Sequence, residues 1–103
     1  MIRGTTPTHI FSLPFEASII ADLRIIYAQN GEEKVVKKLE DCTVDGQTVT
    51  VTLSQEETFK FDCSKSVQLQ VRVLTLGGEA LSSEVIIIAV EQCLNNEVLK
   101  YEA

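Results

Sequence analysis

Residue types on which enzymes and nucleic-acid-binding proteins depend are scarce in this sequence. Its 103 residues include no tryptophan and one histidine, and only 6% of them are aromatic. The nine lysines and arginines are scattered from Arg3 to Lys100, and the net charge is −6. Charge-driven binding to nucleic acid or to an anionic membrane needs clustered positive charge, so we expect neither partner. The low aromatic content also argues against a surface that stacks bases or sugars.

Long apolar runs and a regular set of cysteines are missing too. The longest apolar run, Val85–Val90, is far below the ~20 residues that span a bilayer. The first residues lack the apolar stretch of a signal peptide, so export by that route is not expected. Cysteines occur only at 42, 63 and 93, an odd count at long spacing that favours free thiols in a reducing compartment. A single bridge between Cys42 and Cys63 is the alternative.

No arrangement of residues predicts catalysis. His9 is the only histidine, and no nucleophile with an orienting acid is placed beside it in the sequence. The cysteines do not form the closely spaced pairs of a structural zinc site. Gly77-Gly78 joins two predicted strands and does not open a helix, so it does not indicate a phosphate-binding loop. We therefore predict no enzyme, no catalytic residue, no metal and no cofactor.

Alternating apolar residues and turn signals predict β-strands over the first half of the chain. A short strand is expected over residues 8–13. Asn30-Gly31 is a strong hairpin signal between strands at 21–29 and 32–39, although a short helix over 32–40 is an alternative. A second hairpin is predicted at Asp45-Gly46. With a two-residue loop there, Cys42 lies opposite Val49 on the buried face.

The second half begins with a helix signal and ends with the longest predicted strand pair. Ser54, with Glu57 three residues later, is a capping-box spacing, so one helical turn is expected near 54–59. Phe59 or Phe61 is expected to fill the core beside that turn. Strands are predicted at 66–76 and 81–90. A three-residue loop that aligns Val85 with Val71 is favoured over a two-residue loop that buries Glu84.

The last predicted strand and the tail are the candidate partner surface. Residues 85–90 are apolar on both faces of the strand, which indicates cover from both sides. The tail, residues 91–103, is predicted as a short helix that covers this strand or docks on a partner. The residues expected at such a surface are Val85, Ile87, Leu94, Val98, Leu99 and Tyr101.

Six to eight strands separated by turn signals predict one domain over residues 1–103. The fold class is all-β, an antiparallel β-sandwich of immunoglobulin-like plan, with one short helical turn and a C-terminal helix. The tryptophan and paired cysteines of antibody domains are missing, so the prediction concerns the architecture and not that family.

Four segments carry a resemblance to a group of known proteins. The segments Ile2–Phe15, Tyr27–Gly31, Thr50–Phe59 and Val67–Gly78 together resemble small proteins encoded in phage and prophage tail-gene regions of Gram-positive bacteria. The domain plan resembles the immunoglobulin-like N-terminal domain of phage baseplate upper proteins. The resemblance implies a non-enzymatic tail or baseplate component, located in the virion tail or, if it is not phage-derived, in the host cytoplasm. Its partners would be other tail proteins or a second copy of itself.

A different class of function is the alternative. A carbohydrate- or cell-wall-binding accessory module is also compatible with a small β-sandwich. The absence of tryptophan counts against this alternative, because sugar sites rely on aromatic faces.

Overall fold

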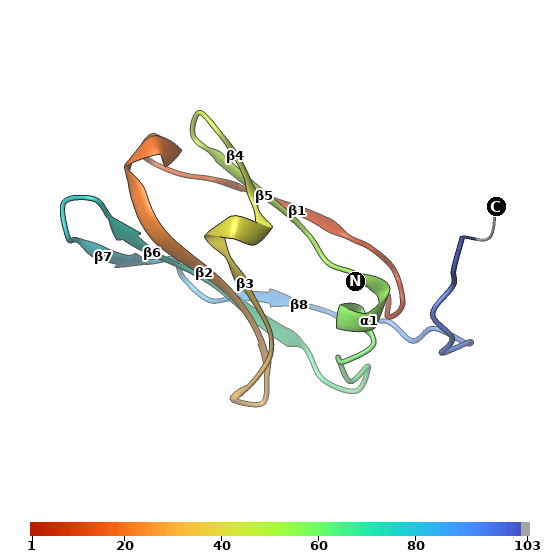
Figure 1. The fold of residues 1–103 in the computed structure, drawn as a ribbon. Helices are drawn as coiled ribbons and strands as arrows, with labels where there is room; N and C mark the ends of the chain where they lie inside the picture. The colour runs from red at the N-terminus through yellow and green to blue at the C-terminus, as the bar shows by residue number, and fades with distance from the viewer. Residues whose placement is uncertain (102–103) are drawn as a thin grey trace.

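A computed structural model of the chain describes residues 1–101 and consists of two antiparallel β-sheets that face each other (Figure 1). The smaller sheet has the order β1-β5-β4. The larger has the order β3-β2-β6-β7, and β8 pairs with β6 beyond β7. This arrangement confirms the predicted all-β sandwich. The strands are β1 (Thr8–Ser12), β2 (Ile20–Gln29), β3 (Glu32–Lys38), β4 (Thr43–Asp45), β5 (Thr48–Thr52), β6 (Val67–Thr75), β7 (Ala80–Ser82) and β8 (Ile86–Ile88).

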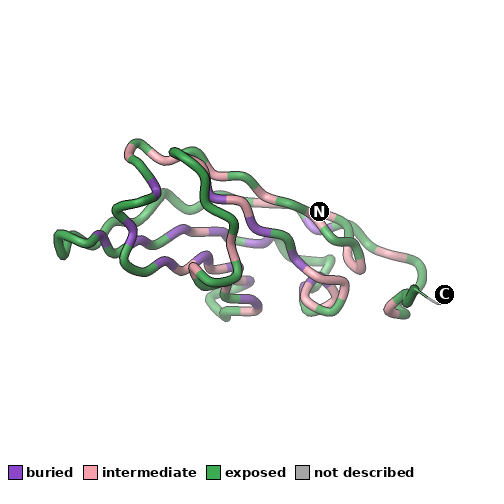
Figure 2. Tube along the Cα trace, turned by 45° about the horizontal axis from the view of Figure 1, so that its top comes forward, coloured by how far each residue is buried: buried purple, intermediate pink, exposed green. Residues whose placement is uncertain are grey.

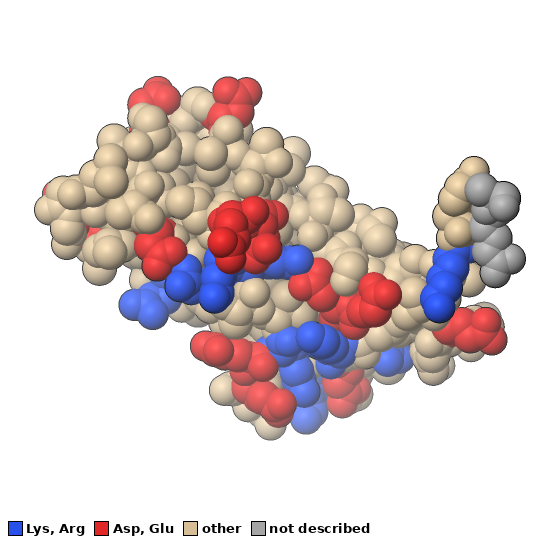
Figure 3. Space-filling model, in the orientation of Figure 1, with Lys and Arg blue, Asp and Glu red and all other residues tan. Residues whose placement is uncertain are grey.

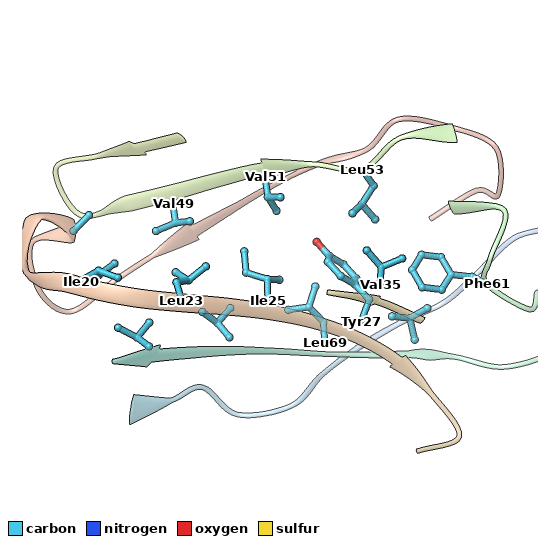
Figure 4. Packing of buried hydrophobic residues seen from close by; sticks show 14 of the residues in the cluster. Ile20, Leu23, Ile25, Tyr27, Val35, Val49, Val51, Leu53, Phe61 and Leu69 are labelled. Carbon is cyan, nitrogen blue, oxygen red and sulfur yellow. The ribbon is translucent and has the colours of Figure 1, made fainter. Parts of the chain in front are cut away.

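The core lies between the two sheets and is made mainly by alternate residues of β2, β5 and β6. Figure 4 shows Val49 and Val51 of β5 pointing toward Leu23 and Ile25 of β2. Every second residue of β6 from Val67 to Val73 is buried, while the residues between them are half-buried or exposed. In Figure 2 the buried stretches accordingly lie along the inner strands, and the loops at both ends are exposed. Apolar burial on one face of each sheet is what holds the two layers together.

The hairpin between β2 and β3 has the predicted turn. Asn30 and Gly31 have φ angles of 51° and 80°, the positive values that a type I′ turn requires. The residues after this turn form a strand, so the alternative helix over 32–40 is wrong apart from the short 3₁₀ turn η2 (Leu39–Asp41). A further 3₁₀ turn, η1 (Ala17–Ile19), leads into β2.

The helical turn after β5 is confirmed with its cap. Helix α1 covers Gln55–Thr58, the Ser54 hydroxyl accepts a hydrogen bond from the Glu57 amide, and the Glu57 carboxylate accepts one from the Ser54 amide. Phe61 follows the turn and fills the core with 1% of its surface exposed. Phe59 is half-buried instead, under the guanidinium of Arg3 at 5.5 Å.

The second hairpin has a different register from the predicted one. Val44 lies opposite Val49, so the two-residue loop is Gly46-Gln47 and Cys42 is not the partner of Val49. The loop carbonyls are bound by the incoming chain: the Leu13 amide donates to Gln47 and the Ala17 amide donates to Gly46, both at 2.7 Å. These long-range bonds hold the turn one residue later than the local signal indicated. Cys42 is half-buried next to the core.

The predicted strand 81–90 is divided into β7 and β8. The residue opposite Val71 is Ser83, whereas the two predicted registers placed Val85 or Glu84 there. The loop consists of residues 76–78, and the Thr75 amide donates a hydrogen bond to the Glu79 carbonyl. The Ser83 hydroxyl accepts a hydrogen bond from the Val71 amide at 3.0 Å, in the place of a backbone carbonyl. Pairing resumes at Ile86, opposite Leu69, displaced by one residue. Glu84 is therefore exposed in the break and is not buried.

The tail is the clearest correction. Residues 91–101 contain no helix, and residues 102–103 of the predicted helix lie outside the described part of the chain. Figure 1 shows the tail leaving the sandwich at the end opposite the β6–β7 turn. Gln55 holds it through two hydrogen bonds to the backbone of Leu99, at 2.7 and 2.9 Å. The tail does not cover β8, since Ile87 is 69% exposed.

Candidate protein-interaction site

Most of the predicted partner surface is exposed, but it lies in two separate places. Ile87 is part of β8, at the edge of the larger sheet, and Val85 directly precedes that strand. The other four residues lie in the tail, which follows β8 in the chain (Figure 1). Val98 is the only half-buried member. The exposed ones, with their exposed fractions, are Val85 (52%), Ile87 (69%), Leu94 (97%), Leu99 (73%) and Tyr101 (93%).

The edge formed by β7 and β8 has no neighbouring strand on its outer side among the described residues. Thr75–Glu79 and Val71–Ser83 are bonded pairs on either side of β7. Antiparallel bonding alternates along a strand, so the backbone N–H and C=O groups of Ala80 and Ser82 point away from β6. These unpaired groups are what an added strand binds.

An apolar groove lies on the inner side of β7. Its volume is about 330 Å³. One wall is the segment that follows β1, and the other is the inner face of β6 and β7, where Leu81 lies opposite Val73. The smaller sheet ends at β1, so no strand of that sheet covers Leu81, which is 41% exposed. The apolar lining residues are Leu13, Pro14, Phe15, Val71, Val73 and Leu81.

A hollow with positive charge lies at the same strand on the outer face of the sheet. It has a volume of about 340 Å³ and is lined in part by Arg24, Arg72 and Ala80. Arg24 lies directly opposite Lys38 on one side and Arg72 on the other, so three cations stand in a row across three strands. Like charges placed directly opposite each other are destabilising.

One acidic group partly balances this row. The Asp22 carboxylate accepts a hydrogen bond from the Arg24 guanidinium, and this contact lowers the pKa of Asp22 below its ordinary value. Within residues 1–101, neither Lys38 nor Arg72 has a carboxylate within ion-pair distance. In Figure 3 the blue side chains lie in the lower half of the view, with red side chains beside them, while the upper half is mostly tan. The outer face beside β7 is therefore positive although the chain as a whole is negative.

The chain exposes more surface than a compact protein of its mass. Its accessible surface is 6595 Å² for 11.4 kDa. Folded monomers of this mass expose about 5,800 Å², so the difference is about 800 Å². That is roughly what one partner buries in a standard protein–protein interface, about 800 Å². The shortest axis, 17 Å, fits two packed sheets, and the tail that leaves the sandwich contributes part of the additional surface (Figure 1).

The one histidine lies in a structural contact. The His9 ring Nδ1 is 2.6 Å from the hydroxyl of Tyr27, whose residue is fully buried. Burial raises the pKa of Tyr27 well above its ordinary value and lowers the pKa of His9, so both side chains are neutral at pH 7, and the tautomer of His9 sets which of them donates. The bond joins β1 of one sheet to β2 of the other. Within residues 1–101, no hydrogen bond joins the His9 ring to a serine, threonine or cysteine side chain.

The cysteines are separate and free. Cys63 is exposed, and Cys42 and Cys93 are half-buried. The described residues contain no group of three or more His, Cys, Asp or Glu side chains placed to hold a metal ion. Likewise, no helix within residues 1–101 has the length and apolar character needed to cross a membrane.

Sequence reasoning missed the groove and the hollow on either side of β7. Leu13 and Phe15 were visible as apolar residues, but their position over β6 depends on the packing of the two sheets. The row of cations depends on strand register, because Lys38, Arg24 and Arg72 are far apart in the sequence. A scan against protein-family models and a search of curated proteins both give no match to this chain.

Proposed function

We propose that this protein is a non-enzymatic structural component of a phage or prophage tail or baseplate, which works by contact with another tail protein. The resemblance of its segments to small tail-region proteins supports the setting. The number of strands and the spacing of the turns support an immunoglobulin-like plan, as in the N-terminal domain of phage baseplate upper proteins. The contact itself is supported by one observation above all, the exposed apolar edge at β7 and β8. Val85, Ile86 and Ile87 are consecutive apolar residues with 52%, 46% and 69% exposure.

Such an edge is costly for a protein that works alone. Exposed apolar strand edges promote aggregation, and natural sheets commonly protect them with charges or proline. The opposite edge of the larger sheet, β3, has this protection in Lys34, Lys37 and Lys38. Since the edge at β8 has none within residues 86–88, a partner that buries it explains the difference.

The test combines detection in particles with a matched pair of variants. Tail particles purified from an induced lysogen should contain the protein at a fixed ratio to the other tail proteins. Ile87→Lys should prevent its incorporation, while Ile10→Lys should not, because Ile10 has a similar exposure of 67% but lies on β1. Absence of the protein from particles, or equal effects of both variants, would contradict the proposal. A concentration-dependent homo-oligomer that never enters particles, measured by sedimentation velocity, would also contradict it.

A further inference from the structure

We infer that the free edge of β7 accepts an extended segment of the partner in which apolar and acidic side chains alternate. This inference rests on the proposed function and names the chemistry of its partner. Two independent features support it: the apolar groove on the inner face of β7, and the row of cations on the outer face of the sheet, which ends at Arg72 on the neighbouring strand β6.

The backbone geometry of β7 allows one more strand. Ala80 and Ser82 have their N–H and C=O groups directed away from β6, as the bonded pairs on either side require. Both side chains are small and exposed, so they place no bulk over the position of an added strand. A segment paired there would extend the larger sheet from β7 outward.

Side chains of a strand point alternately to its two faces, so the added segment meets both environments. Its inward residues would enter the groove beside Leu81, between Phe15 and Val73. That groove is open because the smaller sheet ends at β1. Burial of exposed apolar surface there favours branched aliphatic side chains in the partner.

The outward residues of the segment meet positive charge. Ser82 lies between the added strand and Arg72, which is its direct cross-strand partner. The added strand would lie two strand spacings, about 10 Å, from β6. An arginine side chain on β6 and a glutamate side chain on the added strand can meet across this distance, because the serine between them is small. An acidic residue at that position would relieve the repulsion among Arg72, Arg24 and Lys38.

Two acidic residues limit where the charge can lie. Glu79 and Glu84 flank β7 in the sequence and are both exposed. Acidic side chains of the partner are therefore favoured over the middle of β7 and disfavoured at its two ends. This restriction makes the site short, so a peptide of eight residues covers it.

A direct test uses a capped octapeptide with the sequence Val-Thr-Val-Glu-Val-Glu-Val-Thr, in which only the two central outward-facing positions are acidic. At low salt it should bind the whole protein with saturation below about 1 mM and shift the amide resonances of Ala80 and Ser82. High salt should weaken binding at least tenfold. The lysine counterpart of the peptide should not bind. A version N-methylated at its four central residues, which removes the pairing N–H groups in either strand direction, should not bind either. Arg72→Gln should weaken binding about tenfold, whereas Lys65→Gln, in the exposed loop before β6, should not change it.

The inference is overturned by several results. They are the absence of saturable binding at 1 mM, equal binding of the lysine peptide, equal binding of the N-methylated peptide, and an unchanged affinity in Arg72→Gln. If the protein enters tail particles but the peptide fails, this inference fails and the proposed function stands. If the peptide binds as described but the protein is never found in particles, the proposed function is what fails.

Discussion

The side chain of Gln29 fastens the loop between α1 and β6 to the end of β2. Its Nε2 donates hydrogen bonds to the carbonyls of Asp62 and Lys65 at 2.7 and 3.0 Å, and its Oε1 accepts one from the Asp62 amide at 2.8 Å. Gln29 is only 2% exposed, so these bonds are shielded from water. Gln29→Leu keeps a similar volume and removes all three bonds at once.

The expected loss follows from the net value of a buried hydrogen bond. At about 1 kcal/mol each, three bonds amount to about 3 kcal/mol of the free energy of unfolding. Since a domain of this size is stable by roughly 5–15 kcal/mol, the loss is a large fraction of the total. In a urea titration with a slope of about 1.5 kcal/mol/M, the midpoint should fall by about 2 M.

A second glutamine supplies the control. Gln68 lies on the outer face of β6, is exposed, and makes no side-chain hydrogen bond within residues 1–101. Gln68→Leu should change the free energy of unfolding by less than about 0.5 kcal/mol. The reasoning is refuted if Gln29→Leu costs less than about 1 kcal/mol, or if both variants cost the same.

Two other substitutions test separate contacts. Gly4 has a φ of +78°, and a Cβ there would lie 2.5 Å from the Phe59 ring, whereas Gly31 at +80° has open space around it. Gly4→Ala should therefore destabilise by about 2 kcal/mol more than Gly31→Ala in thermal and urea unfolding, and an equal loss would disprove the clash. Because burial lowers the pKa of His9, the unfolded state binds more protons below its usual pKa of about 6.5, and stability should fall as the pH drops through that range. In His9→Gln this part of the pH dependence should vanish; an unchanged pH profile of stability would show that His9 is not its source.

Signals from neighbouring residues were sufficient to predict the turns and caps whose geometry depends only on those neighbours. The turn at Asn30-Gly31 needs positive φ at two successive residues, and the cap at Ser54 needs a carboxylate three residues later. Both features follow from neighbours in the sequence. The strands they border were therefore predicted close to their observed bounds.

Long-range contacts decided the features that were predicted wrongly. The turn after Asp45 is displaced because the amides of Leu13 and Ala17 bind its carbonyls. The break between β7 and β8 depends on the Ser83 hydroxyl meeting the Val71 amide across the sheet. No turn signal in the sequence marks that break, since serine also occurs within continuous strands. The row of cations beside β7 likewise exists only once the register of β2, β3 and β6 is known.

The pairing of the first residues with the segment after β8 has a mechanical consequence. Ile2 and Glu91 form a parallel bridge, and three backbone hydrogen bonds join residues 1–3 to residues 89–91. In a parallel pair, tension applied toward the start of one strand and the end of the other slides the strands along each other. The three hydrogen bonds then share the force and break at the same time, whereas bonds pulled from one end break one after another. Once the two bonds between Gln55 and Leu99 have broken, a pull between residue 1 and the tail is therefore borne by these three backbone bonds.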